Sequence, residues 1–278
     1  MVAAAARIVG ALLVAYGVIV LLAWIFQNRI AFPGAHSPPP TPQEAGIADG
    51  EAISLTTSDG VQLRGWFLPP DPAPDTGRAP GLIWFYGNME TVYGLAPVFR
   101  MFRPPGIGML VLDYRGYGQS DGTPTEPGLY RDADAAWEYL VARPDVDSTR
   151  IGVYGRSLGS AVALYLATER PVRAVVLDSP FSSGRAMARE HYPFLPPALL
   201  RLDLDIVGRA RRLEVPLLVV HGAIDRIAPV AMGRAVAEAG RAEEFFEIEG
   251  SGHNDTYDVG GLRYRDRLHR FLQDHLNR

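Results

Sequence analysis

The stretch GVYGRSLGSAVAL, residues 152–164, decides how the chain is expected to fold. It spaces Gly155, Ser157 and Gly159 as G-x-S-x-G, between a short apolar run and a longer segment with helical periodicity. This arrangement is typical of a sharp turn from a strand into a helix, with the serine at its tip. A side chain at position 155 or 159 would crowd such a turn. Ser157 is therefore a candidate nucleophile, and an ordinary glycine-rich turn is the alternative.

The chain around this turn alternates between two kinds of segment. Short apolar runs with the length and composition of buried strands occur at residues 81–86, 107–114, 150–155, 172–178 and 216–222. Longer amphipathic segments with helical spacing occur at residues 89–102, 128–143, 157–170 and 228–240. Residues 52–57 and 61–68 predict a hairpin ahead of them. This alternation predicts an α/β fold, with a mostly parallel sheet flanked by helices and ligands at the carboxyl ends of its strands.

The first 32 residues contain an uncharged apolar run, residues 8–26, which is long enough to cross about 28 Å of hydrocarbon. Arg7 and Arg29 bracket this run, and Trp24 lies near its end, where aromatic side chains favour the membrane interface. We predict that residues 1–32 form an N-terminal transmembrane anchor, with a cleaved signal peptide as the alternative. The N-terminal amine favours an inside N-terminus, which would place the rest of the chain on the outer, extracytoplasmic side.

Three further segments complete the predicted domain organisation. Residues 33–50 contain the proline-rich sequence SPPPTPQ and predict a semi-extended linker. Residues 51–278 are expected to form one catalytic domain, because a single α/β domain commonly spans about 200 to 250 residues. Within it, residues 181–213 interrupt the alternation and include the apolar stretch HYPFLPPALL. They predict a small lid that would receive acyl chains near a bilayer. The alternative is a segment that only packs against the domain.

The composition argues against several classes of protein. A net charge of −4 without a basic stripe argues against a nucleic-acid partner. The chain has no cysteine, which excludes disulfides and thiolate metal sites. It has no lysine for a phosphate-binding G-x-x-x-x-G-K-[ST] loop, no G-x-G-x-x-G opening a first helix, and no H-E-x-x-H pattern. We therefore expect neither a cofactor nor a metal ion.

The partners that Ser157 needs follow it in the order serine, acid, histidine, which this architecture requires. Asp225 follows the apolar run 216–222, and His253 follows the strand-like run 243–250. Since each residue comes after a different predicted strand, the three side chains are expected to meet at one edge of the sheet. Asp178 also ends a strand and is the alternative acid. The remaining histidines of strands and helices are interpreted as packing or surface residues: His221, His269 and His275.

Attack on a carbonyl creates an oxyanion, which backbone N–H groups have to stabilise. Leu158, directly after the serine, is the expected first donor. Asn88, in the loop after the predicted strand 81–86, is the expected second donor. Its alternative interpretation is an ordinary turn residue.

Five motifs give the chain a resemblance to a known family. They are FYGNME at 85–90, DYRGYGQSDG at 113–122, YGRSLGS at 154–160, HGAIDRIAP at 221–229 and GSGHND at 250–255. Over about residues 51–278 the chain resembles the α/β-hydrolase superfamily, in particular its membrane-anchored, ABHD-type serine hydrolases with an N-terminal helix. This resemblance implies a triad of Ser157, Asp225 and His253, with an oxyanion hole at Asn88 and Leu158.

Some residues in and near these motifs need a separate interpretation. The family usually has histidine where this chain has Tyr86, a change that bears on the geometry of the oxyanion loop more than on the chemistry. Arg115 is interpreted as a brace between loops, with contact to an acidic substrate as the alternative. Four arginines are interpreted as a solvated face, with anionic headgroups as the alternative partner: Arg201, Arg209, Arg211 and Arg212.

These observations predict a serine hydrolase that cleaves carboxylic ester or thioester bonds of lipids or acylated proteins through an acyl-enzyme intermediate. His253 would deprotonate Ser157, and Asp225 would stabilise the imidazolium. Amide or peptide hydrolysis uses the same chemistry and is one alternative, and a non-catalytic hydrolase fold that only binds is another. The expected partners are a small-molecule or lipid ester and, through the N-terminal helix, the membrane.

Overall fold

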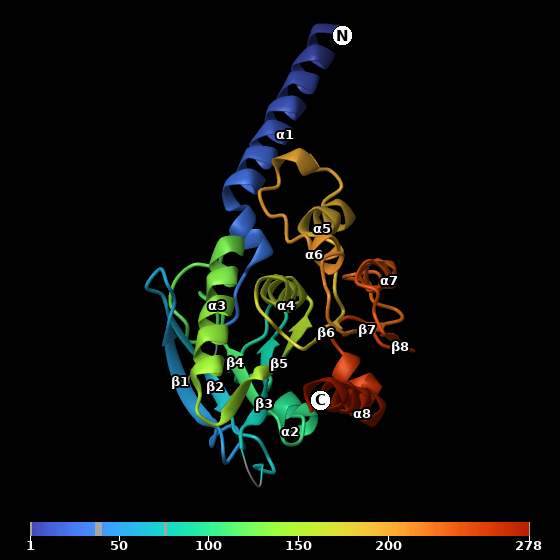
Figure 1. Cartoon of the computed structure of the whole chain (residues 1–278). Helices are drawn as coiled ribbons and strands as arrows, with labels where there is room; N and C mark the ends of the chain where they lie inside the picture. Colours follow the sequence, from blue (N-terminus) through green and yellow to red (C-terminus); the bar gives the residue numbers. More distant parts are fainter. Residues whose placement is uncertain (1, 37–40, 75–76, 278) are drawn as a thin grey trace.

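The computed structural model describes residues 2–36, 41–74 and 77–277, and within them a single mixed sheet dominates the chain (Figure 1). Its strands follow the order β1-β2-β4-β3-β5-β6-β7-β8. β2 pairs antiparallel with β1 and with β4, and all other neighbouring strands are parallel. The strands are β1 (Glu51–Thr56), β2 (Gln62–Leu68), β3 (Ala79–Phe85), β4 (Gly108–Leu112), β5 (Val146–Arg156), β6 (Ala174–Asp178), β7 (Leu217–Gly222) and β8 (Glu244–Ile248). The predicted α/β-hydrolase fold class is confirmed.

Helices cover both faces of this sheet. On one face α3 packs against α4, α4 against α6 and α6 against α7, whereas α2 packs against α8 on the other (Figure 1). The helices are α1 (Val2–Ala31), α2 (Ala96–Phe102), α3 (Glu126–Ala142), α4 (Leu158–Glu169), α5 (Gly184–His191), the 3-10 helix η1 (Pro197–Leu199), α6 (Ile206–Ala210), α7 (Val230–Ala239) and α8 (Thr256–Leu276).

The central strands explain why the sequence shows continuous apolar runs. Every residue of β3, β4, β6 and β7 is buried, because helices cover both faces of these strands. In the parallel register Gly155 of β5 lies beside Phe85 of β3, and Arg156 lies beside Asp178 of β6. The three strands therefore end at the same edge of the sheet, and the loops that follow them meet there.

Two segments differ from what the sequence pattern suggests. Only Ala96–Phe102 is helical within residues 89–102, because turns occupy the stretch before it and Pro97 lies in the first helical turn. Residues 41–50 of the predicted linker pack on the domain: Ala45 and Ile47 are buried, and Arg100 donates a 2.7 Å hydrogen bond to the Ala45 carbonyl. The prolines at 38–40 lie outside the described residues. The predicted domain boundaries stay a prediction.

The first half of helix α1 projects from the domain (Figure 1), whereas its second half, from Tyr16 onward, lies beside residues 181–213. The helix is long and apolar enough to cross a membrane, and the side chains of its most apolar window are not buried in the protein. Phe32, directly after the helix, is buried in the domain core. The residue directly after α1 is therefore already packed in the core of the domain.

Residues 181–213, which we call the cap, connect β6 to β7 and contain α5, η1 and α6. The loop between α5 and α6 reaches alongside α1 (Figure 1). Ser183 and Asp205 begin α5 and α6 with side-chain caps, accepting hydrogen bonds from Ala186 N and Gly208 N. The cap is thus an ordered layer between the sheet edge and α1, and its action as a lid stays a prediction.

Candidate active site

Ser157 lies at the turn from β5 into α4, where the backbone is strained. Its φ of 49° and ψ of −114° fall in a region that residues other than glycine rarely adopt. A Cβ atom on Gly155 would collide with the Gly159 carbonyl, and one on Gly159 would collide with the Phe85 carbonyl. The two glycines therefore let α4 approach β3 and β5 closely enough to hold the serine at the tip of the turn.

The structure brings together the three residues that the sequence places in chain order. The Nδ1 atom of His253 lies 2.6 Å from Oδ2 of Asp225, and its Nε2 atom lies 2.8 Å from the hydroxyl of Ser157. Because the carboxylate of Asp225 can only accept, Nδ1 carries the ring proton and Nε2 is left to accept from the serine. His253 and Asp225 are buried, whereas Ser157 is partly exposed. This is the geometry of a serine with an oriented base.

Asp225 is held as a carboxylate by several donors. Its Oδ1 accepts 2.8 Å hydrogen bonds from the backbone N–H groups of Ile227 and Ala228. Burial alone would raise the pKa of Asp225, but hydrogen bonds from His221 and His253 outweigh it and hold that pKa well below its usual range. His221 Nε2 lies 3.3 Å from Oδ2 of Asp225. The acid therefore stays ionised, which fixes the orientation of the His253 ring.

Asp178, the alternative acid, points into a different part of the core. Its side chain is fully buried and accepts hydrogen bonds from the hydroxyls of Tyr154, Tyr264 and Thr256 at 2.8–3.1 Å. Its Oδ1 accepts from the hydroxyl of Ser179 at 3.0 Å. All of these partners pack β5, β6 and α8 together. The structure thus places Asp178 as a brace beneath the turn and Asp225 on the histidine.

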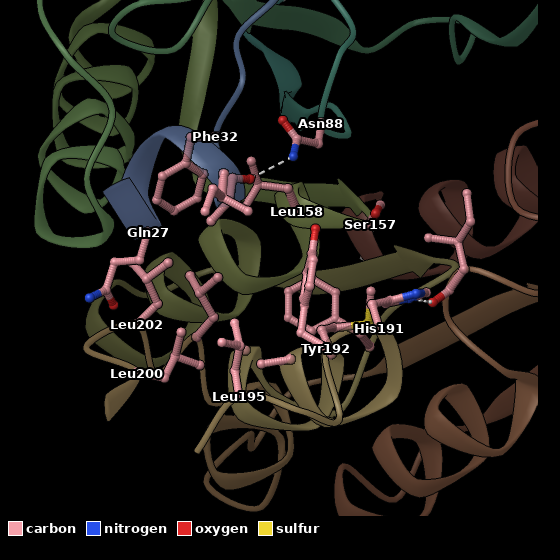
Figure 2. A pocket seen from close by; sticks show the side chains of 18 of the residues that line it. Gln27, Phe32, Asn88, Ser157, Leu158, His191, Tyr192, Leu195, Leu200 and Leu202 are labelled. Carbon is pink, nitrogen blue, oxygen red and sulfur yellow. Dashed lines mark hydrogen bonds between the residues drawn. The ribbon is translucent and has the colours of Figure 1, made fainter. Parts of the chain in front are cut away.

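Asn88 and Leu158 line one cavity together with Ser157 (Figure 2). His253 lines the same cavity. Leu158 is the first residue of α4, where backbone N–H groups have no acceptor within the helix. The side chain of Asn88 is committed elsewhere: its Nδ2 donates 2.7 Å to the Ala31 carbonyl, and its Oδ1 accepts 2.6 Å from the hydroxyl of Tyr117. Both residues that the sequence proposes as backbone donors therefore line the cavity beside Ser157.

Tyr86, the departure from the family pattern, supports the oxyanion loop from below. Its ring is fully buried, and its hydroxyl donates 2.9 Å to Oδ1 of Asp113. Burial raises the pKa of Tyr86 well above its usual range, so the hydroxyl keeps its proton for this bond. The Tyr86 carbonyl accepts 2.9 Å from the hydroxyl of Tyr114. The tyrosine thus fixes the loop through the core without entering the cavity.

Arg156, the residue before the nucleophile, joins three loops of the site. Its buried guanidinium forms an ion pair with Glu90 and donates 2.6 Å to the carbonyl of His253. Glu90 in turn accepts 2.6 Å from the N–H of Gly87 in the oxyanion loop. One buried ion pair therefore ties the histidine loop, the turn of the nucleophile and the oxyanion loop together.

Sequence reasoning missed Arg156, Glu90 and His221 as parts of the site. Arg156 and Glu90 are separated by 66 residues, so their pairing has no local sequence signal. His221 is fully buried at the end of β7 and donates 2.8 Å through Nε2 to the Ala228 carbonyl. Its position four residues before Asp225 was the one signal that could have pointed to it.

Arg115 lies away from the cavity. It forms ion pairs of 2.8 Å with both Asp59 and Asp132, which joins the hairpin turn to α3. The structure thus places it as the brace that the sequence favours. The cap arginines have separate surroundings: Arg201 packs over Trp24, and Arg209 lies over Tyr130 and Tyr165.

The cavity beside Ser157 measures about 750 Å³, within the size range of small-molecule sites. α1 and the cap form much of its wall, and most of the lining side chains are apolar. Figure 2 shows Gln27 of α1 and Leu195 and Leu200 of the cap around the same space as Ser157. Ser157, the candidate nucleophile, therefore lines an apolar chamber between the domain and α1.

Comparisons with known proteins identify the family of the chain. A sequence model of the alpha/beta hydrolase fold matches residues 84–205. The chain is 36% identical to "Uncharacterized protein Rv2307c" of Mycobacterium tuberculosis, over 94% of this chain and 92% of that protein. It is 32% identical to "Alpha/beta hydrolase domain-containing protein WAV2" of Arabidopsis thaliana, over 94% of this chain and 91% of that protein.

A solved structure has the same fold. The Pyrococcus furiosus esterase Pf2001 superposes with a TM-score of 0.68 at 21% identity, covering 88% of this chain and 99% of the esterase. The sequence relatives cover nearly the whole chain at more than 30% identity, which a shared fold alone does not require. The chain therefore belongs to the α/β-hydrolase family.

Proposed function

We propose that this chain is a serine hydrolase that cleaves carboxylic ester or thioester bonds through an acyl-enzyme intermediate. The observation that carries the proposal is the position of His253, hydrogen-bonded to Asp225 on one side and to Ser157 on the other. A serine hydroxyl is a weak nucleophile without a base, and this arrangement supplies one. The family membership supports a hydrolase, and the site geometry supports the serine mechanism.

In the acylation step, Nε2 of His253 takes the proton of Ser157 as Oγ attacks the carbonyl carbon of the substrate. The carbonyl oxygen becomes an oxyanion, which the backbone N–H groups of Asn88 and Leu158 stabilise. The imidazolium is stabilised by the ionised Asp225. It then gives its proton to the leaving alcohol or thiol, and the acyl group stays on Ser157.

In the deacylation step, water enters in place of the leaving group and His253 acts as base again. Nε2 of His253 takes a proton from the water molecule while the water oxygen attacks the acyl carbonyl carbon. The second tetrahedral intermediate collapses, His253 returns the proton to Ser157, and a carboxylic acid is released. No cofactor or metal ion takes part in either step.

The apolar walls of the cavity indicate the class of substrate. Side chains such as Met187, Leu195 and Leu202 line it beside the nucleophile. An acyl chain would bury apolar surface there, at roughly 25 cal/mol per Å² removed from water. We therefore propose esters or thioesters of lipids or acylated proteins as substrates, and α1 as the single-pass anchor that holds the domain on the outer side of the membrane.

A substrate panel tests the proposal on the detergent-solubilised full-length chain. Ester, thioester and amide substrates with the same acyl group are compared, and turnover of the first two is expected to exceed that of the amide. Ser157→Ala should lower kcat by about 10⁴-fold or more. Ser160→Ala is the matched control, because its hydroxyl bonds the Gly155 carbonyl and does not line the cavity.

Three outcomes would contradict the proposal in different ways. Preferred cleavage of the amide would make the chain an amidase or peptidase. Equal turnover by wild type and Ser157→Ala would remove the serine mechanism. A folded wild-type chain that turns over none of the substrates would favour a hydrolase fold that only binds.

A further inference from the structure

One face of α1 forms part of the cavity wall. The lining residues of this helix follow one another at helical spacing: Val20, Ala23, Trp24, Gln27, Ile30 and Ala31. The first three belong to the uncharged run of residues 8–26, the part of α1 that is apolar enough to lie in a membrane. One wall of the chamber beside Ser157 is thus a helix segment that is apolar enough to lie in a membrane.

The tip of the cap contacts α1 within the uncharged run of residues 8–26. The hydroxyl of Tyr16 donates a 2.7 Å hydrogen bond to the carbonyl of Phe194. Tyr16 lies ten residues before Phe26, the end of the apolar run, which is about 15 Å at the rise of an α-helix. If α1 spans a bilayer along its normal, Phe194 therefore lies near the middle of the hydrocarbon, and tilt of α1 makes it shallower.

The cap tip, residues 192–200, has the chemistry of a segment in lipid. Its sequence YPFLPPALL has no charged residue, and the side chains of Tyr192, Phe194 and Leu199 are 41–57% exposed. Three of its nine residues are prolines without an N–H group, and the N–H groups of Tyr192, Leu195 and Leu199 donate to carbonyls within the cap. Three of the six N–H groups of the cap tip therefore have an acceptor within the cap, which lowers the cost of placing this backbone in a low-dielectric environment.

The polar boundary of the cap coincides with that of α1. Arg201, the first charged residue after the cap tip, packs its guanidinium 4.6 Å from the ring centre of Trp24. Its backbone N–H donates 2.7 Å to Oε1 of Gln27, one residue beyond the apolar run of α1. Tryptophan and arginine are the residues that mark a membrane interface. The cap and α1 therefore pass from apolar to polar residues at the same level.

We propose that the cap tip is immersed in the lipid leaflet beside α1 and that the chamber opens sideways into the hydrocarbon between these two elements. The acyl chain of a bilayer-resident substrate would enter there and bring its carbonyl to Ser157 without crossing water. The route of entry rests on the proposed hydrolase function, whereas the immersion of the cap does not. α1 is then a substrate-binding element as well as an anchor.

The depth of the cap is tested without any enzymatic readout. The chain has no natural cysteine, so Phe194→Cys can be labelled at one position with an environment-sensitive fluorophore. The full-length chain is reconstituted into phosphatidylcholine vesicles that carry a nitroxide quencher on the lipid acyl chains. Leu262→Cys is the matched control, because Leu262 is an exposed apolar residue of α8, which lies at the end of the domain away from α1 (Figure 1).

We expect strong quenching at position 194 and none above background at position 262. If the quencher lowers the fluorescence at position 194 no more than at position 262, the immersion of the cap is overturned. This result would leave the proposed function untouched, because the measurement does not depend on turnover.

The lateral entry is tested by filling the α1 wall. Ala23→Phe places a ring in the cavity wall, so kcat/KM for a palmitoyl ester should fall about tenfold or more while that for an acetyl ester is retained. Ala11→Phe is the matched control on an exposed position of α1 that does not line the cavity, and it should change neither value. Equal losses for both esters, or no loss for the palmitoyl ester, would overturn the entry route. Absence of turnover in the wild type would instead refute the proposed function.

Discussion

Asp178 and Asp225 both follow buried strands, and their hydrogen-bond partners differ in a way that supports a catalytic role only for Asp225. Asp225 accepts from His253, whereas Asp178 accepts from tyrosine and threonine hydroxyls behind the nucleophile. The sequence places both residues at strand ends, so order along the chain alone does not choose between them. The choice depends on which loop reaches the histidine.

The two acids should respond differently to the same substitution. Asp225→Asn removes the charge that holds the ring proton on Nδ1 of His253, and kcat should fall by about 10³ to 10⁴-fold. Asp178→Asn should keep the kcat of the folded protein within a few-fold. Because it weakens hydrogen bonds to buried hydroxyls, it should lower the free energy of unfolding by about 1–3 kcal/mol. Steady-state kinetics and thermal unfolding in detergent measure both effects. A larger loss of kcat in Asp178→Asn would contradict these roles.

At the scale of elements, the turn after β5 is connected to its neighbours through Arg156. This side chain binds Glu90 after β3 and the His253 carbonyl after β8. Burial raises the pKa of Glu90, and the charge of Arg156 opposes that rise. The position of the reactive serine therefore depends on an ion pair that the nucleophile motif itself does not reveal.

Removing this arginine should give a pH-dependent loss of stability. In Arg156→Met the buried Glu90 loses its counter-charge, so its folded-state pKa rises further above its unfolded value. A carboxyl group whose pKa is raised in the folded state makes the folded protein less stable as pH rises through that pKa. The variant should therefore have a lower free energy of unfolding at about pH 8 than at about pH 5. Adding Glu90→Gln should abolish this difference. Unfolding midpoints at the two pH values test it, and a loss independent of pH would contradict it.

The strands and the nucleophile turn could be predicted because their causes are local. β3, β4, β6 and β7 are covered on both faces, which requires continuous apolar runs, and Gly155 and Gly159 are required by close backbone contacts. The start of α2 at Ala96 instead of residue 89 was not predictable from apolar spacing, because turns and a proline determine it. Pairs such as Arg156 with Glu90 depend on tertiary contacts between distant segments, which leave no periodic signal.

At the scale of the whole molecule, the active site, the cap and α1 form one unit. The Asn88 side chain donates to the Ala31 carbonyl at the end of α1, so the oxyanion loop is bonded directly to the proposed membrane anchor. The hydropathy of residues 8–26 predicted the helix, but its contribution to the cavity wall follows only from tertiary packing. α1 is therefore joined to the rest of the chain by direct contacts as well as by residues 33–50.

The proposed orientation has a direct test in intact cells that express the chain. Val2→Cys and Leu262→Cys each introduce the one cysteine of the chain, at the start of α1 and on α8. A membrane-impermeant maleimide should label position 262 without permeabilisation and position 2 only after it, because the N-terminal amine favours the inside. The reverse pattern would contradict the outer location of the domain.

The central claim is that Ser157 is the nucleophile of this molecule. The most direct measurement is the reaction of the folded full-length chain with a fluorophosphonate probe, followed by peptide mass spectrometry to locate the adduct. We expect a single adduct on Ser157, abolished in Ser157→Ala and strongly slowed in His253→Ala, because the base no longer activates the hydroxyl. A folded wild-type chain that stays unlabelled, or equal labelling of Ser157→Ala, would contradict it.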